Sequence, residues 1–144
     1  MQYSKSVILY RDRPQYGLVL KLLLLIPAVP LAGSLYLWSS GHNTDGLALL
    51  IESFIVGLIF WFVFPREYQI FEDHIRIVLG GFLSVKIGFQ NVKVVRTTGR
   101  TGLTVNFVTR ITRRYVEIVI KRGLGIVITP TDNEIFIENA NRAL

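Results

Sequence analysis

The sequence contains no cysteine, and this absence removes several kinds of chemistry at once. Disulfides, thiolate metal sites and cysteine nucleophiles are excluded, while the redox compartment stays undetermined. Histidine is scarce as well, since only His42 and His74 are present and they lie far apart in the chain. Two distant histidines do not predict a metal cluster. We therefore expect the protein to carry no metal and no other cofactor.

Charged residues are also few, at 18% of the chain against roughly 25% in a typical soluble domain. Apolar residues make up 51% of the chain, and the mean hydropathy is +0.44, which is unusual for a soluble protein. The remaining charges sum to +6. A basic balance favours anionic partners such as lipid headgroups, nucleic acid or acidic protein surfaces, and in a membrane protein the lipid comes first.

The common catalytic motifs are missing too. The chain has no Gly-x-Ser-x-Gly, no Walker loop and no His-Glu-x-x-His. The glycines of residues 99–102 and 123–125 are too closely spaced for phosphate-binding loops and predict β-turns. Glu72 and Asp73 form a carboxylate pair, but they lie at a predicted hairpin tip, which favours a solvated turn. We expect no enzymatic activity unless another chain supplies the chemistry.

Long apolar runs are present instead, at residues 17–38 and 46–64, and each contains a single charge, Lys21 or Glu52. The first run has 22 residues, which at ~1.5 Å per residue spans about 33 Å, enough for a hydrocarbon core of ~30 Å. Both runs exceed the ~18 residues expected of a spanning helix. The short polar link Ser39–Asp45 predicts that the two helices form an antiparallel hairpin.

Basic residues predict the orientation of this hairpin, because they flank the helices and are absent from the link. The positive-inside rule then places both termini in the cytoplasm and the link outside. The flanking residues are Lys5, Arg11, Arg13, Lys21 and Arg66. Interfacial aromatic residues are expected at Tyr16, Tyr36, Trp38, Trp61 and Tyr68.

A cleaved signal peptide is a competing interpretation of the first apolar run. Residues 22–31 could form its hydrophobic region, with a weak cleavage site at residues 31–33. The segment before that region would be unusually long, about twenty residues, and a second spanning segment follows directly. These two features favour the hairpin.

Two prolines and one acid stand out within the spans. Pro27 and Pro30 cannot donate a backbone hydrogen bond, so we expect a kink, either in a simple anchor or as a ligand-lined break. Glu52 is expected to lie roughly 15 Å in depth from Lys21, too far for an ion pair. It is then either protonated or hydrogen-bonded within the hairpin, directed to the outer surface, or in contact with another membrane protein or a second copy.

The rest of the chain predicts about seven short antiparallel strands at roughly 8–10-residue spacing, typical of a sandwich or barrel. The expected strands are residues 68–71, 75–79, 82–89, 91–97, 103–108, 115–121 and 125–128. Thr131 or Asp132 can cap a C-terminal helix whose apolar face includes Ile135, Phe136 and Ala140. The predicted organisation is a cytoplasmic segment (1–16), a transmembrane hairpin (17–64) and a cytoplasmic domain (65–144) of α+β class.

Three segments of this domain resemble bacterial pleckstrin-homology-like (PH-like) domains of small membrane proteins. Residues 68–77 (YQIFEDHIRI) look like the first hairpin of that family, and residues 87–95 (IGFQNVKVV) look like its following strand. Residues 128–137 (ITPTDNEIFI) are similar to its closing strand and capped helix. The resemblance covers residues 66–144 and implies a sandwich or barrel closed by one helix, with the hairpin in a bacterial plasma membrane. It does not imply phosphoinositide binding.

Basic residues carry the functional prediction. After Pro65 the chain has twelve Lys or Arg and seven acids, a net charge of +5. The candidate contact residues for an anion or a partner are Arg96, Arg100, Arg110, Arg113 and Arg114, which cluster around two turns, with Glu52 as a candidate contact inside the membrane. These arginines either only keep the loops soluble or contact headgroups or an acidic partner. Nucleic-acid binding is disfavoured, because no surface combining aromatic and basic residues stands out.

The expected function is a non-enzymatic, membrane-anchored interaction module whose domain contacts lipid headgroups or a protein partner. Anchoring raises the local concentration of weak contacts, so a modest site can suffice. The alternative is an accessory or assembly subunit of a larger membrane complex, or a homo-oligomer, with the helices as the binding surface. Glu52 and the kinked first helix favour this alternative, and the arginine cluster favours the first interpretation.

Overall fold

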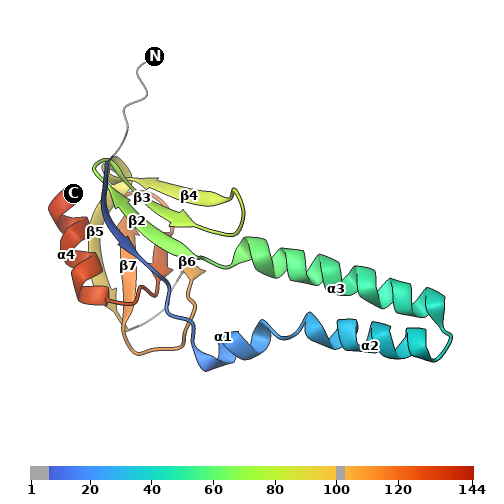
Figure 1. The fold of residues 1–144 in the computed structure, drawn as a ribbon. Helices are drawn as coiled ribbons and strands as arrows, with labels where there is room; N and C mark the ends of the chain where they lie inside the picture. Colours follow the sequence, from blue (N-terminus) through green and yellow to red (C-terminus); the bar gives the residue numbers. More distant parts are fainter. Residues whose placement is uncertain (1–6, 100–102) are drawn as a thin grey trace, which may run out of the picture.

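The computed structural model describes residues 7–99 and 103–144, and a helical hairpin projects from its β-rich domain (Figure 1). The first arm of the hairpin consists of α1 (Leu18–Leu23) and α2 (Ala28–Ser39), and the second is α3 (Asn43–Val63). The stretches Leu18–Ser39 and Asn43–Val63 are each long and apolar enough to cross a membrane, by length and composition. The chain reverses between them over residues 40–42.

The first arm is broken at residues 24–27, between α1 and α2. Pro27 lies at the break and caps α2 with a φ of −62°. Pro30 lies in the first turn of α2, where a backbone N–H would have no acceptor within the helix. Its lack of an N–H therefore does not interrupt α2. The expected kink is therefore present, and Pro27 alone marks it.

Small residues allow α2 and α3 to pack closely. Ser34 donates a hydrogen bond to the Gly46 carbonyl (2.7 Å), and Ser53 donates one to the Pro27 carbonyl (2.6 Å). A Cβ at Gly46 would lie 3.1 Å from the Ser34 carbonyl oxygen, closer than most real contacts. Small residues and hydroxyl hydrogen bonds are the usual means of helix association where no water is present.

A strand that sequence reasoning did not predict precedes the hairpin. This strand, β1 (Ile8–Asp12), pairs antiparallel with β2 (Glu67–Phe71), the first strand after the hairpin. Both helical arms are therefore inserted between two neighbouring strands of one sheet. The segment expected to be a separate cytoplasmic N-terminal region contributes an edge strand to the β-rich domain.

The seven strands expected after the hairpin are all present and form two sheets with β1. The first sheet has the order β1-β2-β3-β4, with β3 at His74–Val78 and β4 at Ser84–Gly88. A short 3-10 helix, η1 (Phe89–Asn91), leads to the second sheet, which has the order β5-β7-β8-β6. Its strands are β5 (Val92–Thr98), β6 (Thr104–Phe107), β7 (Tyr115–Ile120) and β8 (Gly125–Ile128).

One pairing differs from the expected antiparallel arrangement, since β6 and β8 are parallel. A seven-residue loop, 108–114, separates β6 from β7. This loop lets β7 lie two positions away from β6 in the sheet. The strand β8 then lies between them, antiparallel to β7 and parallel to β6. Parallel neighbours need such a crossover, whereas a tight turn would join antiparallel ones.

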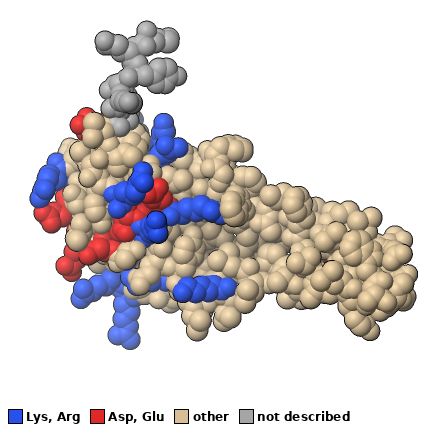
Figure 2. Space-filling model, viewed as in Figure 1, with Lys and Arg blue, Asp and Glu red and all other residues tan. Residues whose placement is uncertain are grey.

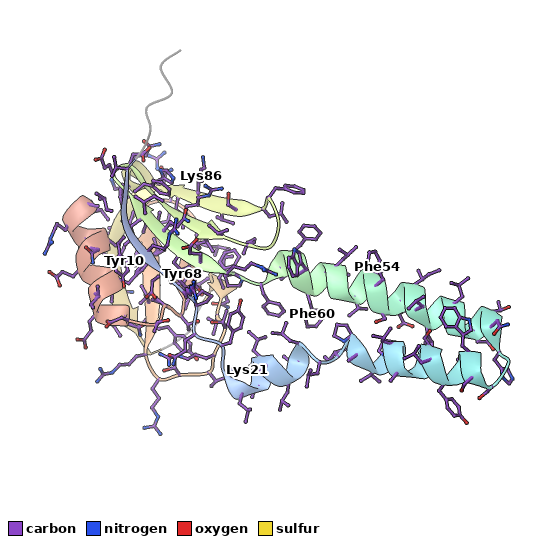
Figure 3. The ribbon with its side chains drawn as sticks, in the orientation of Figure 1. Tyr10, Lys21, Phe54, Phe60, Tyr68 and Lys86 are labelled. Atoms are coloured by element: carbon purple, nitrogen blue, oxygen red, sulfur yellow. The ribbon has the colours of Figure 1, made fainter. Side chains whose placement is uncertain are left out.

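The C-terminal helix α4 (Asn133–Ala143) covers the core between the sheets (Figure 3). As expected, Asp132 caps it, accepting hydrogen bonds from the backbone of residues 134 and 135. Phe136 is fully buried, and its ring contacts those of Tyr10 and Tyr68 edge-on at 6.3 and 6.2 Å. Two expectations are wrong: Ile135 is 46% exposed, and Tyr68 is a core residue rather than an interfacial one.

Candidate functional site

The base of the hairpin is held to the β-rich domain by hydrogen bonds that backbone carbonyls accept from an amide and two threonine hydroxyls. The amide of Gly17 donates to the Thr109 carbonyl (2.9 Å), and the Thr109 hydroxyl donates to the Gln15 carbonyl (2.8 Å). The hydroxyl of Thr131 donates to the Arg13 carbonyl (2.8 Å). These bonds fix the segment that enters α1 against the β6–β7 loop and against the residues that lead into α4.

Gly17 permits the closest of these approaches. A Cβ at this position would lie 2.9 Å from the Cβ of Arg110 and 3.1 Å from its Cα. Any larger residue would push the β6–β7 loop away from α1. The β6–β7 loop, which carries three of the candidate arginines, is therefore held at the level where the apolar helix begins.

The other arm of the hairpin is fixed by the turn between β3 and β4. Gly80 lies so close to the end of α3 that a Cβ there would lie 1.5 Å from the Trp61 carbonyl oxygen. Next to it, the ring of Phe82 packs at 6.0 Å from that of Phe62. Gly81 has a φ of +65°, a conformation that favours glycine, and completes the turn.

Two large apolar side chains are exposed at this end of the domain, one beside each arm. Phe82 in the β3–β4 turn is 86% exposed, and Ile111 in the β6–β7 loop is 83% exposed. Basic residues gather over the β-rich end of the molecule and at the base of the hairpin, and the remaining hairpin surface shows no charge from this side (Figure 2). The base of the hairpin therefore combines exposed apolar tips with cationic side chains.

The candidate arginines are only partly brought together. Arg110, Arg113 and Arg114 lie in the β6–β7 loop, whereas Arg96 lies on β5, opposite Glu117 of β7. Arg96 forms a 2.9 Å ion pair with Glu117, and Arg114 lies 4.0 Å from Glu134. Arg113 is exposed and has no ion pair with another described residue. Arg110 is half-buried, and Arg100 lies outside the described residues.

Glu52 lies on an exposed side of α3, and Ser53 instead of Glu52 faces α2. Its carboxylate forms no hydrogen bond or ion pair with any residue that the structure describes. The expected alternative of a hydrogen bond within the hairpin is therefore not the arrangement observed. The Glu52 side chain instead points outward from the hairpin surface.

Both carboxylates of the β2–β3 turn, Glu72 and Asp73, are exposed. Asp73 is an exposed residue whose carboxylate lies 2.6 Å from the His74 ring, and the hydrogen bond to that ring lowers the pKa of Asp73. The His74 ring in turn stacks on Phe71 at 4.4 Å. Within residues 7–99 and 103–144, no three His, Asp or Glu side chains are grouped as metal ligands.

A cavity of about 520 Å³ lies between the two arms at the base of the hairpin. Sequence reasoning used its two arginines, Arg13 and Arg66, only to orient the hairpin and did not predict that they converge. The signal available was a basic and an aromatic residue at the domain end of each span. The lining residues are Arg13, Tyr16, Leu24, Pro27, Gly57, Phe60, Trp61, Phe64 and Arg66.

Comparison with known families gives one match, to the bacterial PH domain family, over residues 66–141. This region is just over half of the chain. The chain belongs to the bacterial PH domain family. No curated protein and no solved structure gave a match.

Membership in the bacterial PH domain family confirms the resemblance drawn from residues 68–77, 87–95 and 128–137. It indicates a binding module, since PH domains generally bind lipids or proteins. The family match begins at Arg66, so β1 and the hairpin lie before the matched region. In this member of the family, the cavity at the base of the hairpin is therefore built almost entirely from residues outside that region.

Proposed function

We propose that this protein is a non-enzymatic, membrane-anchored interaction module. In this proposal the hairpin spans the bacterial plasma membrane, and the PH domain contacts lipid headgroups or a protein partner at the cytoplasmic surface. The observation that carries it is the outward-facing apolar surface of the hairpin. In the most apolar stretch of each arm, only 6% of the first arm and 11% of the second is buried. Side chains such as Leu18 and Phe54 are 74% and 67% exposed.

Apolar helices also occur as buried core helices and as signal sequences, and both roles fit this chain poorly. A core helix would be covered by the protein, because exposed apolar area costs about 25 cal/mol per Å² in water. Cleavage of a signal peptide near residues 31–33 would remove β1 from the sheet that it forms with β2. The bilayer is the remaining environment that matches the hairpin.

The connection of both arms to one domain supports the proposed topology. Because β1 and β2 pair side by side, the chain leaves and re-enters the domain on the same side of a membrane. Basic residues flank both arms at that end, and residues 39–45 have none. The positive-inside rule then favours the cytoplasm for the domain and both termini.

Headgroup contact follows from what surrounds the hairpin base. Phe82 and Ile111 would enter the interfacial region of the bilayer, and Arg113 would lie at headgroup level, because the β6–β7 loop is bonded to the start of α1. Basic residues gain ~1 kcal/mol each near an anionic leaflet. Weak contacts of this kind suffice when the domain is already tethered.

Membrane extraction tests the anchoring. The full-length protein should stay in the membrane pellet after an alkaline carbonate wash, because the arms bury apolar surface in the bilayer. A protein lacking residues 18–63 is the control and should be released. Release of the full-length protein by the wash would overturn the proposal.

A second candidate function is favoured by Glu52. An exposed acid on a span-length helix is costly in lipid and is usually paired within a complex, so an accessory subunit or a homo-oligomer accounts for it. Purification in mild detergent separates the two functions. A stoichiometric co-purifying chain that is lost in Glu52→Leu, with Phe54→Leu as the control on the same helix, would support the subunit. An unpartnered monomer would support the interaction module.

A further inference from the structure

The break in the first arm opens a space at the base of the hairpin. Within the first arm, α2 packs along α3, whereas α1, on the domain side of the break at residues 24–27, diverges from α3 (Figure 1). The 520 Å³ cavity lies in this divergence, and Phe60 projects from α3 into the space between the arms (Figure 3). Its volume falls within the ~300–1,000 Å³ of typical small-molecule sites.

The walls of the cavity divide into an apolar and a cationic part. Leu24, Pro27, Gly57 and Phe60 lie along the two apolar arms and carry no polar side chain. Arg13 and Arg66 lie at the domain end, and no carboxylate is among the residues that line the cavity. An apolar compartment with cations at one end matches an amphiphile with an anionic head.

Both arginines have unused capacity for an anion. None of the ion pairs between described residues includes Arg13 or Arg66, whereas the neighbouring Arg11 is paired with Glu67 at 2.7 Å. The guanidinium of Arg66 lies over the Trp61 ring, 3.7 Å from its centroid, which holds the charge at the end of α3. The hydroxyl of Tyr16 donates to the Pro65 carbonyl and closes the domain side.

We propose that this cavity binds one anionic phospholipid, with its phosphate between Arg13 and Arg66 and one acyl chain between the break in the first arm and α3. The proposal rests on the proposed membrane anchoring of the hairpin. It assigns the ligand to a site formed by the hairpin and the entering segment, since every lining residue except Arg66 precedes the region shared with the family.

A lipid fits this space better than a helix of a second protein. A helix with its side chains is about 11 Å across, so the cavity would accommodate only roughly one turn. An acyl chain is thinner and is present at high concentration around the hairpin. The two arginines select against a headgroup that adds a positive charge, such as choline, so the preference should be for phosphatidylglycerol over phosphatidylcholine.

Lipid titration of the full-length protein in mild detergent, read by native mass spectrometry, tests the proposal. Phosphatidylglycerol should bind at one molecule per chain and about tenfold or more tightly than phosphatidylcholine. The double variant Arg13→Gln and Arg66→Gln should weaken phosphatidylglycerol binding by about tenfold or more and abolish the preference. The matched control, Lys21→Gln and Arg142→Gln, removes two charges outside the cavity and should leave binding unchanged.

A second variant fills the apolar part. Gly57→Leu places a side chain in the cavity, and a Cβ at Gly57 would be 3.9 Å from that of Pro27, so the backbone has room for it. It should weaken the binding of both lipids. It decides the proposal if the arginine variant does not fold.

Several results would overturn the assignment. Equal binding of phosphatidylglycerol and phosphatidylcholine by the wild type would do so. Binding of phosphatidylglycerol as tight as that of the wild type, in both the double arginine variant and Gly57→Leu, would do so too. Competition by soluble glycerol phosphate at equal concentration would assign the site to a free anion, and a lipid-free dimer would assign it to a second copy. The carbonate extraction of the membrane is independent, so a protein that is anchored but binds no lipid here refutes only this inference.

Discussion

Tyr68 links the first sheet to the rest of the domain core. It is fully buried, and its hydroxyl donates a hydrogen bond to the Phe107 carbonyl at 3.2 Å. Burial raises the pKa of Tyr68 above its ordinary value of about 10. The folded domain therefore keeps this proton at a pH at which the unfolded chain has lost it.

The pH dependence of stability follows from this difference. The stabilisation associated with the protonated hydroxyl should be complete below about pH 10 and decline as the pH rises above that value, because the unfolded chain then binds fewer protons. Tyr68→Phe should lose about 1 kcal/mol at neutral pH and show a shallower alkaline decline. Urea unfolding at several pH values measures both, and an equally steep decline in the variant would contradict the account.

The β6–β7 loop carries the next prediction. Replacing Arg110, Arg113 and Arg114 with Ser should weaken binding to anionic vesicles by up to about 3 kcal/mol, more than a hundredfold, at ~1 kcal/mol per charge. The measurement uses a hairpin-free protein that joins residues 1–17 to 64–144 through a short Gly/Ser linker. Binding should also fall with salt, because the Debye length shrinks from ~10 Å at 0.1 M to ~3 Å at 1 M.

The matched variant for the loop is Arg142→Ser, which lies at the end of α4 and should bind like the wild type. Unchanged binding of the triple variant, or no vesicle binding by the wild type at low salt, would remove headgroup contact from the proposed function. The arginines would then serve only loop solubility.

Single residues were predicted from sequence where local chemistry decides their position. The cap of α4 was narrowed to Thr131 or Asp132 and the kink to Pro27 and Pro30, because capping and the missing proline N–H act within a few residues; the structure selects Asp132 and Pro27. The convergence of Arg13 and Arg66 was missed: the sequence shows a basic and an aromatic residue at the domain end of each span, but the pairing of β1 with β2 that brings the two arginines to one cavity was not predicted.

At the scale of elements, β1 is part of the domain and not a tail. It pairs with β2 along its length, and its Tyr10 packs on Phe136 of α4. A fragment of residues 66–144 lacks this strand and exposes the edge of β2. An unpaired sheet edge is a known liability for aggregation.

The hairpin-free protein tests the role of β1. Because the Tyr16 hydroxyl reaches the Pro65 carbonyl, a short linker between residues 17 and 64 should close the gap. This protein should be monomeric and mostly β by circular dichroism, and it should unfold at a higher urea concentration than residues 66–144 alone. Equal stability of the two proteins would show that β1 contributes nothing to the fold.

Strands were predictable where apolar residues alternate, as in β3, where Ile75 and Ile77 are buried. The strand β1 was missed because its apolar run is short and most of its residues are exposed on an edge. The parallel pairing of β6 with β8 was also beyond sequence reasoning. Alternation specifies which face of a strand is buried but not which neighbour it pairs with.

The whole molecule combines an apolar helical hairpin and a β-rich domain in one chain. The apolar arms are long enough to cross a bilayer, and in the proposed membrane-spanning arrangement the sheet that holds both their ends would keep the domain on one side of it. The PH domain, the cationic base and the exposed tips Phe82 and Ile111 would then meet the same membrane surface. Membrane insertion with the domain in the cytoplasm is the central claim.

Cysteine labelling in intact cells tests that claim most directly, because the chain has no native cysteine to interfere. Asn43→Cys at the tip of the hairpin and Leu144→Cys at the C-terminus are compared with a membrane-impermeant maleimide. The account predicts labelling at position 43 in intact cells and labelling at position 144 only after the membrane is opened. Labelling at position 144 but not at position 43 in intact cells would contradict it. Recovery of the protein in the soluble fraction, with both positions open to the maleimide, would contradict it as well.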